Sequence, residues 1–498
     1  MKVLIWFPSN VKGGGPRLFV NLVSALSRIK EIEKLKIVLS AECKNNEYFE
    51  GLKKIDSVNI YYYPNSKITE LKSEAEVIEG KISDLTKGIS ELEHEIAKIN
   101  LPEILEKDTA FFRKIANPIV LLKLMSRYIK IVGDIKHRIG NKQDEINKLS
   151  VELNDILEKE KKLRFNEIKI KEEKIRGNPV DLYGEDCDVV YFFWPHFIEF
   201  QETTRPSVCT FQDVVILDFP ENVGGSNAKN FFEDSQKWLT ETTIIATSSN
   251  YIKSRLQDLF NLKSDSIIVV PHRGFVMEYF SIKGNADKIR GKYNLPKEYI
   301  VYPANLGFHK NHYNLLIAQS RFKYKEKYPL VLFGNFTEYI RQSPPDYPEL
   351  LNCARLVSLI NRLKLGQGRD FFSLGYVEDE DVFALIKNAK FLVMPSLAEG
   401  GGSYPVEEAL RMGVPVACSD IPVMREHLAG RTARIKWFDP ESTNSITEAM
   451  NEIIEHYDLY RESAIKGMND PAQSWDEIAE NYVKIFKMAI EKFYKRNN

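Results

Sequence analysis

The sequence of 498 residues is 43% hydrophobic and 28% charged, which is typical of a globular protein with roughly two to four domains. Its formal net charge of −1 argues against an overall attraction to nucleic acid or another polyanion. No apolar run reaches the about 18 residues that a spanning helix needs, and the five cysteines lack metal-ligand spacing. We therefore expect a cytoplasmic protein, with contact at the inner face of the membrane left open.

The first 64 residues alternate between apolar runs and amphipathic stretches. The expected elements are strands at 2–7, 35–39 and 58–62 and helices at 17–28 and through 48–52. This alternation predicts a doubly wound parallel sheet. Residues 1–64 would be the first part of an N-terminal Rossmann-like domain. A glycine loop at 11–16 follows the first strand, and by itself it fits a phosphate site or a plain strand-to-helix turn.

Residues 65–177 have a different pattern, which predicts a coiled coil inserted into this domain. Apolar residues recur at spacings of three and four through Ile68, Leu71, Ala75, Ile78, Ile82, Leu85, Ile89, Leu92, Ile96 and Ile99. A second seam runs through Ile139, Ile146, Leu149, Leu153, Ile156 and Leu163, with Lys142 and Glu160 at its polar breaks. We expect an antiparallel hairpin within the chain. Pairing between chains, in a homo-oligomer or with a partner protein, is the alternative.

The segment between the two seams, residues 101–135, is expected to be a small helical tip, because Pro102 and Pro118 interrupt it. It is apolar and locally basic, with Arg113, Lys114, Lys123, Arg127, Lys130 and Lys136. This composition fits either the hydrophobic closure of the hairpin or peripheral contact with an anionic membrane.

The α/β pattern resumes after the insertion and predicts two further domain segments. Residues 178–285 complete the N-terminal domain, residues 286–470 form a second Rossmann-like domain, and a C-terminal helix occupies 471–498. Strands are expected at 188–191, 207–211, 243–246, 267–270, 299–302, 330–333 and 371–374. The fold class is thus α/β, with two doubly wound domains. Ligands of such sheets bind at the carboxyl ends of the strands, which places a ligand site between the domains.

Residues 395–420 carry the strongest chemical signal. A buried strand at 391–394 leads into a loop with Gly400, Gly401 and Gly402, a helix from near Pro405 to Gly413, and a strand at 414–417. Proline suits the first helical turn and glycine the position just past the end. The free N–H groups and the dipole of such a helix start favour an anion.

Carboxylates flank this anion corner, with Glu399 before the glycines and Glu407 and Glu408 after them. Carboxylates repel phosphate but accept hydrogen bonds from hydroxyl groups. A nucleotide-sugar meets both requirements, because its diphosphate suits the backbone N–H groups and its sugar and ribose hydroxyls suit the carboxylates.

The segment EGGGSYPVEEALRMGVPV, which begins at Glu399, resembles the paired-glutamate motif of the GT-B fold retaining glycosyltransferases of family GT4 (glycosyltransferase group 1). YIVYPANLGFHKNHYNLL, which begins at Tyr299, resembles the segment of that family that carries a phosphate-binding lysine, here Lys310. TFQD from Thr210, with Pro220, is similar to a third motif, and Gly13 to Gly15 fit the first glycine loop. The likeness covers about residues 1–63 and 180–490, and the coiled coil lies outside it.

The resemblance implies transfer of a hexose from a nucleotide diphosphate sugar to a hydroxyl of a glycan or glycolipid, with retained anomeric configuration, in surface polysaccharide biosynthesis. It implies that Glu399 and Lys310 hold the donor sugar and the diphosphate. The other donor-binding residues are expected to be Gly14, Gly15, Asn305, Gly334, Tyr376, Val377, Gly400, Gly401, Gly402, Ser403, Glu407 and Glu408. Tyr376 and Val377 would lie beside the base. No metal or other cofactor is expected, and GDP-mannose is the first donor to test.

The chain departs from the family pattern at its second glutamate, because the loop is one residue longer. Glu407 keeps the seven-residue spacing, whereas Glu408 aligns better with the helix that follows. The two side chains point about 100° apart on a helix, so only one can face the ribose. We expect this to be Glu408, with Glu407 left as a solvated residue of the helix.

Two further departures concern the family's other polar groups. Asn305 stands where many members have a diphosphate-binding arginine, so that charge is missing or comes from Arg273 or His309. Gln212 stands at the position of a histidine that contacts the donor sugar and the leaving phosphate. His196, on the neighbouring strand end, is the candidate substitute, so Gln212 and His196 join Glu399 and Lys310 in the predicted catalytic set.

Other readings remain open. Asp379 and Asp381 resemble a metal-binding DxD pair, but acidic residues at this position are typical of a helix start, and no metal site is expected. A nucleotide-sugar epimerase on the same fold would need an acid/base pair that the sequence does not display. A coiled-coil scaffold with a decayed transferase site is the non-enzymatic alternative.

Overall fold

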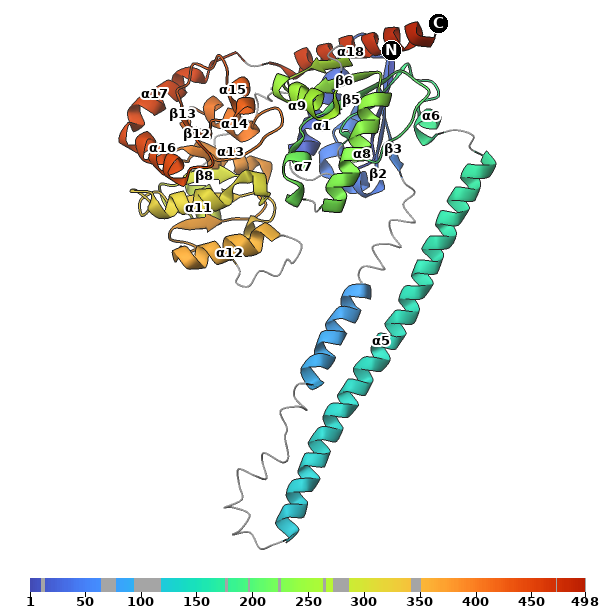
Figure 1. Cartoon of the computed structure of the whole chain (residues 1–498), viewed down its shortest axis with the longest axis vertical. Coiled ribbons are helices and arrows are strands. Elements are labelled where there is room, and N and C mark those ends of the chain that lie inside the picture. Colours follow the sequence, from blue (N-terminus) through green and yellow to red (C-terminus); the bar gives the residue numbers. More distant parts are fainter. Residues whose placement is uncertain are drawn as a thin grey trace. The chain divides into compact units, whose positions relative to one another are not determined.

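The computed structural model describes residues 1–9, 14–63, 78–93, 118–174, 178–195, 198–222, 225–262, 266–271, 286–341, 351–471 and 473–497. The chain divides into two compact units (Figure 1). The core unit comprises residues 1–39, 45–61 and 178–498, and the inserted unit comprises residues 40–44 and 62–177.

The first sheet of the core unit has seven strands among the described residues, in the order β3-β2-β1-β4-β5-β6-β7. These strands are β1 (Lys2–Phe7), β2 (Lys34–Ser40), β3 (Val58–Tyr63), β4 (Val189–Phe192), β5 (Ser207–Phe211), β6 (Ile244–Thr247) and β7 (Ile267–Val269). β1 pairs in parallel with β2 and β4, with Val3 opposite Leu35 and Val189. Helices flank the sheet (Figure 1), so its strands are continuous apolar runs, and Val3 to Phe7 are all buried.

The second sheet has six strands among the described residues, in the order β10-β9-β8-β11-β12-β13. These are β8 (Ile300–Pro303), β9 (Leu330–Phe333), β10 (Phe371–Ser373), β11 (Leu392–Met394), β12 (Val416–Ser419) and β13 (Ile435–Phe438). All pairings between its described strands are parallel, and Leu392 of β11 lies opposite Val301 of β8. The doubly wound arrangement expected for both halves is confirmed.

Helices connect the strands of each sheet. In the first domain they are α1 (Gly14–Leu26), α6 (Pro179–Tyr183), α7 (Val215–Asp218), α8 (Gly225–Glu241) and α9 (Asn250–Phe260), with 3₁₀ turns η2 (Glu47–Phe49), η3 (Leu52–Lys54) and η5 (Pro220–Asn222). The 3₁₀ turn η1 (Ala41–Asn45) belongs to the inserted unit except for its last residue. In the second they are α10 (Ala286–Tyr293), α11 (His312–Arg321), α12 (Leu351–Leu363), α13 (Asp379–Lys387), α14 (Tyr404–Arg411), α15 (Pro422–His427), α16 (Thr443–Glu455) and α17 (Tyr457–Gly467), with η8 (Phe308–Lys310) and η9 (Thr337–Arg341).

The last helix, α18 (Trp475–Asn497), follows the second domain but packs on the first, against α1 and β5 (Figure 1). The buried Tyr482 of α18 forms a hydrogen bond with β5, since its hydroxyl lies 2.9 Å from Thr210 Oγ1. The Tyr191 hydroxyl lies 2.7 Å from the same oxygen. The helix expected over the C-terminal segment is confirmed, and its apolar face serves the core of the N-terminal domain.

Both sheets change winding direction between their first and fourth strands, at β1/β4 and at β8/β11. Loops that leave adjacent strands there turn to opposite faces of the sheet and open a ligand crevice at the carboxyl ends. The loops after β8 and β11 are residues 304–311 and 395–403, which contain Lys310 and Glu399. The topology therefore places the two strongest sequence motifs side by side.

Three local predictions were wrong. The helix expected through 48–52 is a series of 3₁₀ turns, and the strand expected at 414–417 is β12, two residues later. Gly413 has φ of 68° and ends α14, and this leaves Val414 and Pro415 in the connection. Gly14 and Gly15 belong to α1 rather than to the loop. Pro16 does not prevent this, because the N–H groups of the first helical turn have no partners within the helix, so the N–H that proline lacks is not needed.

The inserted unit contains a helix at 78–93 and α5 (Pro118–Lys174). Ile78 and Ile156 are buried together, with Ile82, Leu149 and Leu153 packed against them. The described parts of the two seams therefore contact each other within the chain. A Cβ atom on Gly88 would meet Lys142, as expected when the two helices run antiparallel.

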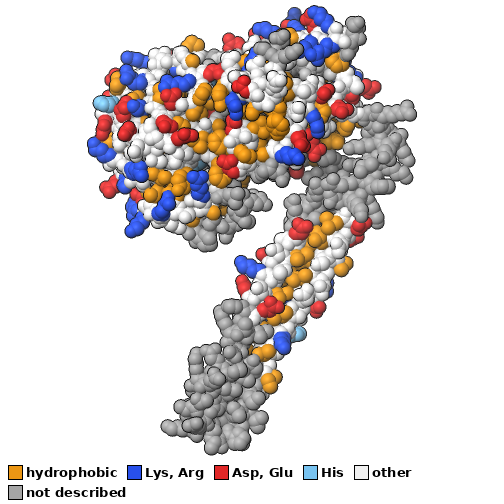
Figure 2. Space-filling view, viewed as in Figure 1, with side chains coloured by type: hydrophobic (Ala, Val, Ile, Leu, Met, Phe, Trp, Pro, Cys, Tyr) orange, Lys and Arg blue, Asp and Glu red, His pale blue; other side chains and the backbone are white. Residues whose placement is uncertain are grey.

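α5 begins at Pro118 and continues through residue 135, so the separate helical tip expected over 101–135 is wrong for residues 118–135. Proline is accommodated at the first position of a helix, where its missing N–H removes no helical hydrogen bond. With 57 residues α5 is roughly 86 Å long. On the face shown in Figure 2, apolar side chains form a strip along this unit between charged ones. Residues 101–117 and the side chains of Lys123 and Arg127 lie outside the described part of the chain.

None of the helices in the described part of the chain is long and apolar enough to cross a membrane.

Candidate active site

The loop from β11 to α14 has the local structure that its sequence predicts. Pro405 lies in the first turn of α14, and Ser403 is the N-cap residue without a side-chain hydrogen bond to the helix. The Ser403 hydroxyl instead points back to the Met394 sulfur, at 3.7 Å. The first N–H groups of α14 are thus left without a side-chain cap, as an anion site requires.

The three glycines of this loop are needed for close packing. Gly402 has φ of 127°, and a Cβ atom there would lie 2.1 Å from His427 Nδ1. A Cβ atom on Gly400 would lie 2.5 Å from the Gln212 carbonyl oxygen, and one on Gly401 would lie 2.5 Å from Ser248 Cβ. Gln212 and Ser248 belong to the N-terminal domain, so the glycines allow its backbone to approach this loop.

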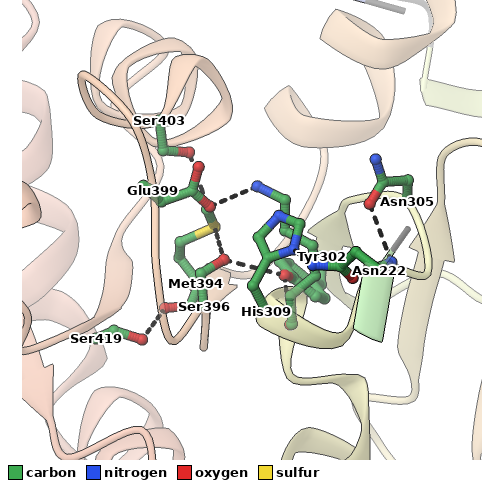
Figure 3. A network of polar contacts seen from close by, with 11 residues as sticks. Asn222, Tyr302, Asn305, His309, Met394, Ser396, Glu399, Ser403 and Ser419 are labelled. Atoms are coloured by element: carbon green, nitrogen blue, oxygen red, sulfur yellow. Dashed lines mark hydrogen bonds and ion pairs between the residues drawn. The ribbon is translucent and has the colours of Figure 1, made fainter. Parts of the chain in front are cut away.

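Lys310 and Glu399 form an ion pair at the centre of the site, and Figure 3 shows Glu399 within its network of polar contacts. Lys310 Nζ donates to Glu399 Oε1 at 2.6 Å, and their side chains are 17% and 9% exposed. The Tyr302 hydroxyl donates to the Lys310 carbonyl at 2.7 Å, and the Leu397 N–H donates to the His309 carbonyl at 2.7 Å. The two loops are therefore joined by backbone as well as side-chain contacts.

The loop that carries Lys310 is also held by the N-terminal domain. Asn222 Oδ1 accepts from the Phe308 N–H at 2.8 Å, and Asn222 Nδ2 lies 3.2 Å from His309 Nδ1. Burial, with Lys310 and His312 nearby, lowers the pKa of His309 to about 2. His309 is therefore neutral near pH 7 in this structure and does not provide the second positive charge. Asn305 is exposed, and its Oδ1 accepts from the Gly307 N–H at 3.1 Å.

The two adjacent glutamates point to different partners, but neither is solvated as expected for one of them. Glu407 is 1% exposed and contacts Arg431 Nη2 at 2.5 Å and His427 Nε2 at 3.4 Å. Glu408 is 3% exposed and accepts from Arg17 Nη2 at 2.7 Å. The prediction that Glu407 is a solvated helix residue is wrong, because α15 and Arg431 cover the face of α14 that carries it.

A second group of predicted residues lies at the ends of β9 and β10. Gly334 has φ of 136°, and a Cβ atom there would lie 2.6 Å from the Ala304 backbone. Its N–H donates to the Gly375 carbonyl at 2.9 Å, which ties the loops together. Val377 is buried, while Tyr376 is 46% exposed. The predicted base site therefore has an apolar floor and an accessible aromatic ring.

The predicted site residues of the N-terminal domain differ in how close they lie to the glycine loop at 400–402. Gln212 is buried, and its carbonyl accepts from the Ser248 hydroxyl at 2.6 Å, beside Gly400. Gly14 and Gly15 form the start of α1. His196 and Arg273, the candidate substitutes for the family's histidine and arginine, lie outside the described residues.

The acidic residues around 379 open α13, as the capping interpretation expects. Asp381 accepts from the Tyr293 hydroxyl at 2.5 Å and pairs with Lys292, and Asp379 accepts from the Tyr48 hydroxyl at 3.2 Å. In the part of the chain that the structure describes, no cluster of three or more His, Cys, Asp or Glu side chains could hold a metal ion.

Several residues at this junction were missed by the sequence analysis. Arg17, Tyr48, Asn222 and Ser248 reach the C-terminal domain from four separate segments. Glu426 reaches from the C-terminal domain to the N-terminal one. Its carboxylate accepts from the Asn250 and Tyr251 N–H groups, at 2.7 and 2.9 Å, at the start of α9. Only Arg17 had a local signal, since it directly follows the glycine loop.

Known proteins resemble different parts of this chain. Residues 285–469 match the family described as "Glycosyl transferases group 1". The O-antigen chain mannosyltransferase B of Escherichia coli is 27% identical over 305 residues, which cover 60% of this chain and 72% of that protein. The serotype-specific mannosyltransferase WbdA of Escherichia coli is 25% identical over 292 residues, which cover 57% of this chain and 34% of WbdA. The matched region thus spans about a third of the length of WbdA.

The fold is also shared with solved structures. Anabaena HepE in complex with UDP and glucose superposes with a TM-score of 0.58 at 12% sequence identity, over 98% of this chain and 100% of HepE. At this identity the likeness concerns the fold, which is the two-sheet arrangement described above. Residues 285–469 are therefore similar to the group 1 glycosyl transferases, family GT4, and the chain has the GT-B fold.

Proposed function

We propose that the chain is a retaining hexosyltransferase that moves a sugar from a nucleotide diphosphate donor to a hydroxyl of a glycan or lipid-linked acceptor. Surface polysaccharide biosynthesis, in the cytoplasm or at the inner face of the membrane, is the proposed setting. The Escherichia coli relatives named as mannosyltransferases favour mannose, so GDP-mannose is the first donor to test. HepE, which was solved with UDP, makes UDP-sugars the second.

The observation that carries this proposal is the contact between Lys310 and Glu399 at the β8/β11 switch point. The Lys310 ammonium and the Glu399 carboxylate are only 2.6 Å apart and neutralise each other. A nucleotide-sugar presents a diphosphate to the lysine and hydroxyl groups to the carboxylate, so it replaces one ion pair by two matched interactions.

The geometry supports a division of labour during transfer. As the bond between the anomeric carbon and the phosphate oxygen breaks, negative charge grows on the leaving diphosphate, where Lys310 and the first N–H groups of α14 would stabilise it. Glu399 would hold the sugar hydroxyls and face the positive charge that develops on the ring. The acceptor oxygen then bonds to the anomeric carbon on the same face, and its proton passes to the leaving phosphate oxygen. A protein base is therefore not required.

The nucleoside half would bind at the ends of β9 and β10 and at α14. Tyr376 and Val377 would lie beside the base, and Glu408 would accept from the ribose hydroxyls. Arg431 and His427 already engage the Glu407 carboxylate, which favours Glu408 for the ribose. The described contacts between the two helices favour a coiled coil within the chain over pairing with a second copy or a partner protein.

A donor panel tests the proposal. Purified protein is incubated with GDP-mannose, UDP-glucose and related donors, with and without sugar acceptors, and the release of nucleoside diphosphate is measured. The expected result is release from one donor, with the retained product identified by NMR and a loss of activity in Glu399→Gln. Conversion of the donor sugar without nucleotide release would indicate an epimerase. A protein that neither releases nucleoside diphosphate nor binds a donor would support the scaffold interpretation.

A further inference from the structure

Arg17 crosses from the N-terminal domain into the C-terminal one. It lies in the first turns of α1, yet its Nη2 lies 2.7 Å from Glu408 Oε1 of α14. Its guanidinium carbon also lies 5.5 Å from the centroid of the Phe383 ring of α13. The side chains of Arg17 and Glu408 are only 18% and 4% exposed. A largely buried ion pair therefore joins the two domains where the ribose is proposed to bind.

The Glu408 carboxylate uses half of its acceptor capacity in this contact. Oε1 accepts from Arg17, whereas Oε2 is buried and has no hydrogen-bond partner among the described residues. A buried carboxylate oxygen without a donor is unfavourable, because folding removed the water that would satisfy it. A ligand hydroxyl is the group that would satisfy it, since it brings a proton and no charge.

The electrostatics of Glu408 depend on Arg17. Burial raises the pKa of Glu408, and the Arg17 charge and hydrogen bond oppose that rise. Asp379 also faces this carboxyl and favours its protonated form. Removal of Arg17 would therefore leave two negative groups together in a buried place, and Glu408 would tend toward the neutral acid, which is a weaker acceptor.

We propose that Arg17 is a positioning residue for ribose recognition, which rests on the function proposed above. It fixes one oxygen of Glu408 and keeps the carboxylate ionised, so that the other oxygen accepts from a ribose hydroxyl of the donor nucleotide. Because Arg17 belongs to the other domain, the ribose contact is complete only when the two domains are together. The N-terminal domain thereby contributes to donor recognition through a residue that does not touch the donor.

The test compares nucleotides that differ by one hydroxyl group. The affinities of GDP and 2′-deoxy-GDP, and in parallel of UDP and 2′-deoxy-UDP, are measured by isothermal titration calorimetry. The wild-type protein is expected to prefer the ribonucleotide by about tenfold, which is typical of one hydrogen bond to a charged group. Arg17→Met and Glu408→Gln should each abolish this preference, and the double variant should lose no more. Arg17→Lys should restore part of it.

Arg28→Met is the matched control, because Arg28 makes an exposed ion pair with Asp476 just after the same helix. It should leave the preference unchanged. If Arg17→Met weakens both nucleotides equally, Arg17 acts on the diphosphate or on the fold, and the inference is wrong. If Arg17→Met keeps the full preference, it is also wrong. Should Arg17→Met fail to fold, Arg17→Lys and Glu408→Gln still decide between these outcomes.

The two proposals fail in different ways. A wild-type protein that binds no nucleoside diphosphate, or does not distinguish ribose from deoxyribose, overturns the proposed function at this site and the inference with it. A preference that Glu408→Gln abolishes but Arg17→Met does not would overturn the inference alone.

Discussion

Lys310 Nζ lies 2.6 Å from Glu399 Oε1, and both side chains are largely buried. The lysine follows β8 and the glutamate follows β11, so the contact spans the switch point of the second sheet. Each group therefore satisfies the other, and a nucleotide-sugar bound as proposed would have to separate them. The strength of this pair would then set part of the affinity for the proposed donor.

Glu399→Gln separates the role of this carboxylate in transfer from its effect on nucleotide binding. We expect sugar transfer to fall by roughly 100-fold, because the contacts to the sugar and its developing charge are lost. The affinity for GDP without a sugar should rise a few fold, since Lys310 no longer has a competing anion. Stopped assays of donor turnover and calorimetry with GDP measure the two effects. Glu326→Gln, at an exposed position, is the control, and full turnover in Glu399→Gln would refute the site assignment.

Gly402→Ala should destabilise the core unit more than an ordinary glycine substitution. Its φ of 127° is reached by few residues other than glycine, and a Cβ atom would lie 2.1 Å from His427 Nδ1. We expect a loss of about 3 kcal/mol in the free energy of unfolding. Gly430→Ala is the matched control, because Gly430 has φ of 79° and nothing within 4 Å of a Cβ atom. It should cost about 1 kcal/mol, and equal losses in urea titrations would show that the loop relaxes away from His427.

His312 should make the core unit sensitive to acid. Its ring is fully buried, neither nitrogen has a hydrogen-bond partner among the described residues, and burial with Lys310 nearby lowers its pKa from 6.5 to about 3. Between pH 6.5 and about 3, His312 therefore binds a proton in the unfolded chain but not in the folded chain. Stability should fall as the pH drops below 6.5, by about 2 kcal/mol at pH 5 from this group.

His312→Phe keeps a ring against Tyr302 and removes the titrating group. Its stability should fall less steeply between pH 6.5 and 4 in chemical denaturation series than that of the wild-type protein. His456→Phe, at an exposed position, controls for the loss of one imidazole. If the stabilities of wild type and His312→Phe depend on pH in the same way, the prediction is wrong, and the protonated ring must have a hydrogen-bond acceptor in the folded protein.

Ile156→Asp tests the hairpin of the inserted unit. Ile156 is 7% exposed and packs with Ile78, so a charge there should cost about 3 kcal/mol and unfold the described contacts between the two helices. Circular dichroism should show a loss of helix, and proteolysis should cut within residues 78–174. Val151→Asp is the matched control, because Val151 lies on the same helix and is 71% exposed. If both variants keep their helix content, the seam contributes nothing to the stability of this unit.

The sequence alone predicted the elements that depend on local pattern. Continuous apolar runs such as 2–7 and 330–333 are strands of parallel sheets, and Pro405 and Gly413 mark the ends of α14 as expected. The sequence assigned Lys310 and Glu399 to one donor site only through the resemblance to family GT4. The sheet order of the structure shows that their strands, β8 and β11, are neighbours whose loops share an edge. The short 3₁₀ turns and the start of α5 at Pro118 were missed, since local propensity does not define them.

Only the tertiary structure decided how the two domains share the site. The burial of both Glu407 and Glu408, the reach of Arg17 and Asn222 into the second domain, and the approach of Gln212 to Gly400 all join residues more than twenty positions apart. Such contacts depend on how distant segments pack, within the second domain for Glu407 and between the two domains for the others. No spacing in the sequence encodes this packing. The glycines at 400–402 show the difference: their number predicted a phosphate loop, whereas their steric surroundings show that each also makes room for a neighbour in the fold.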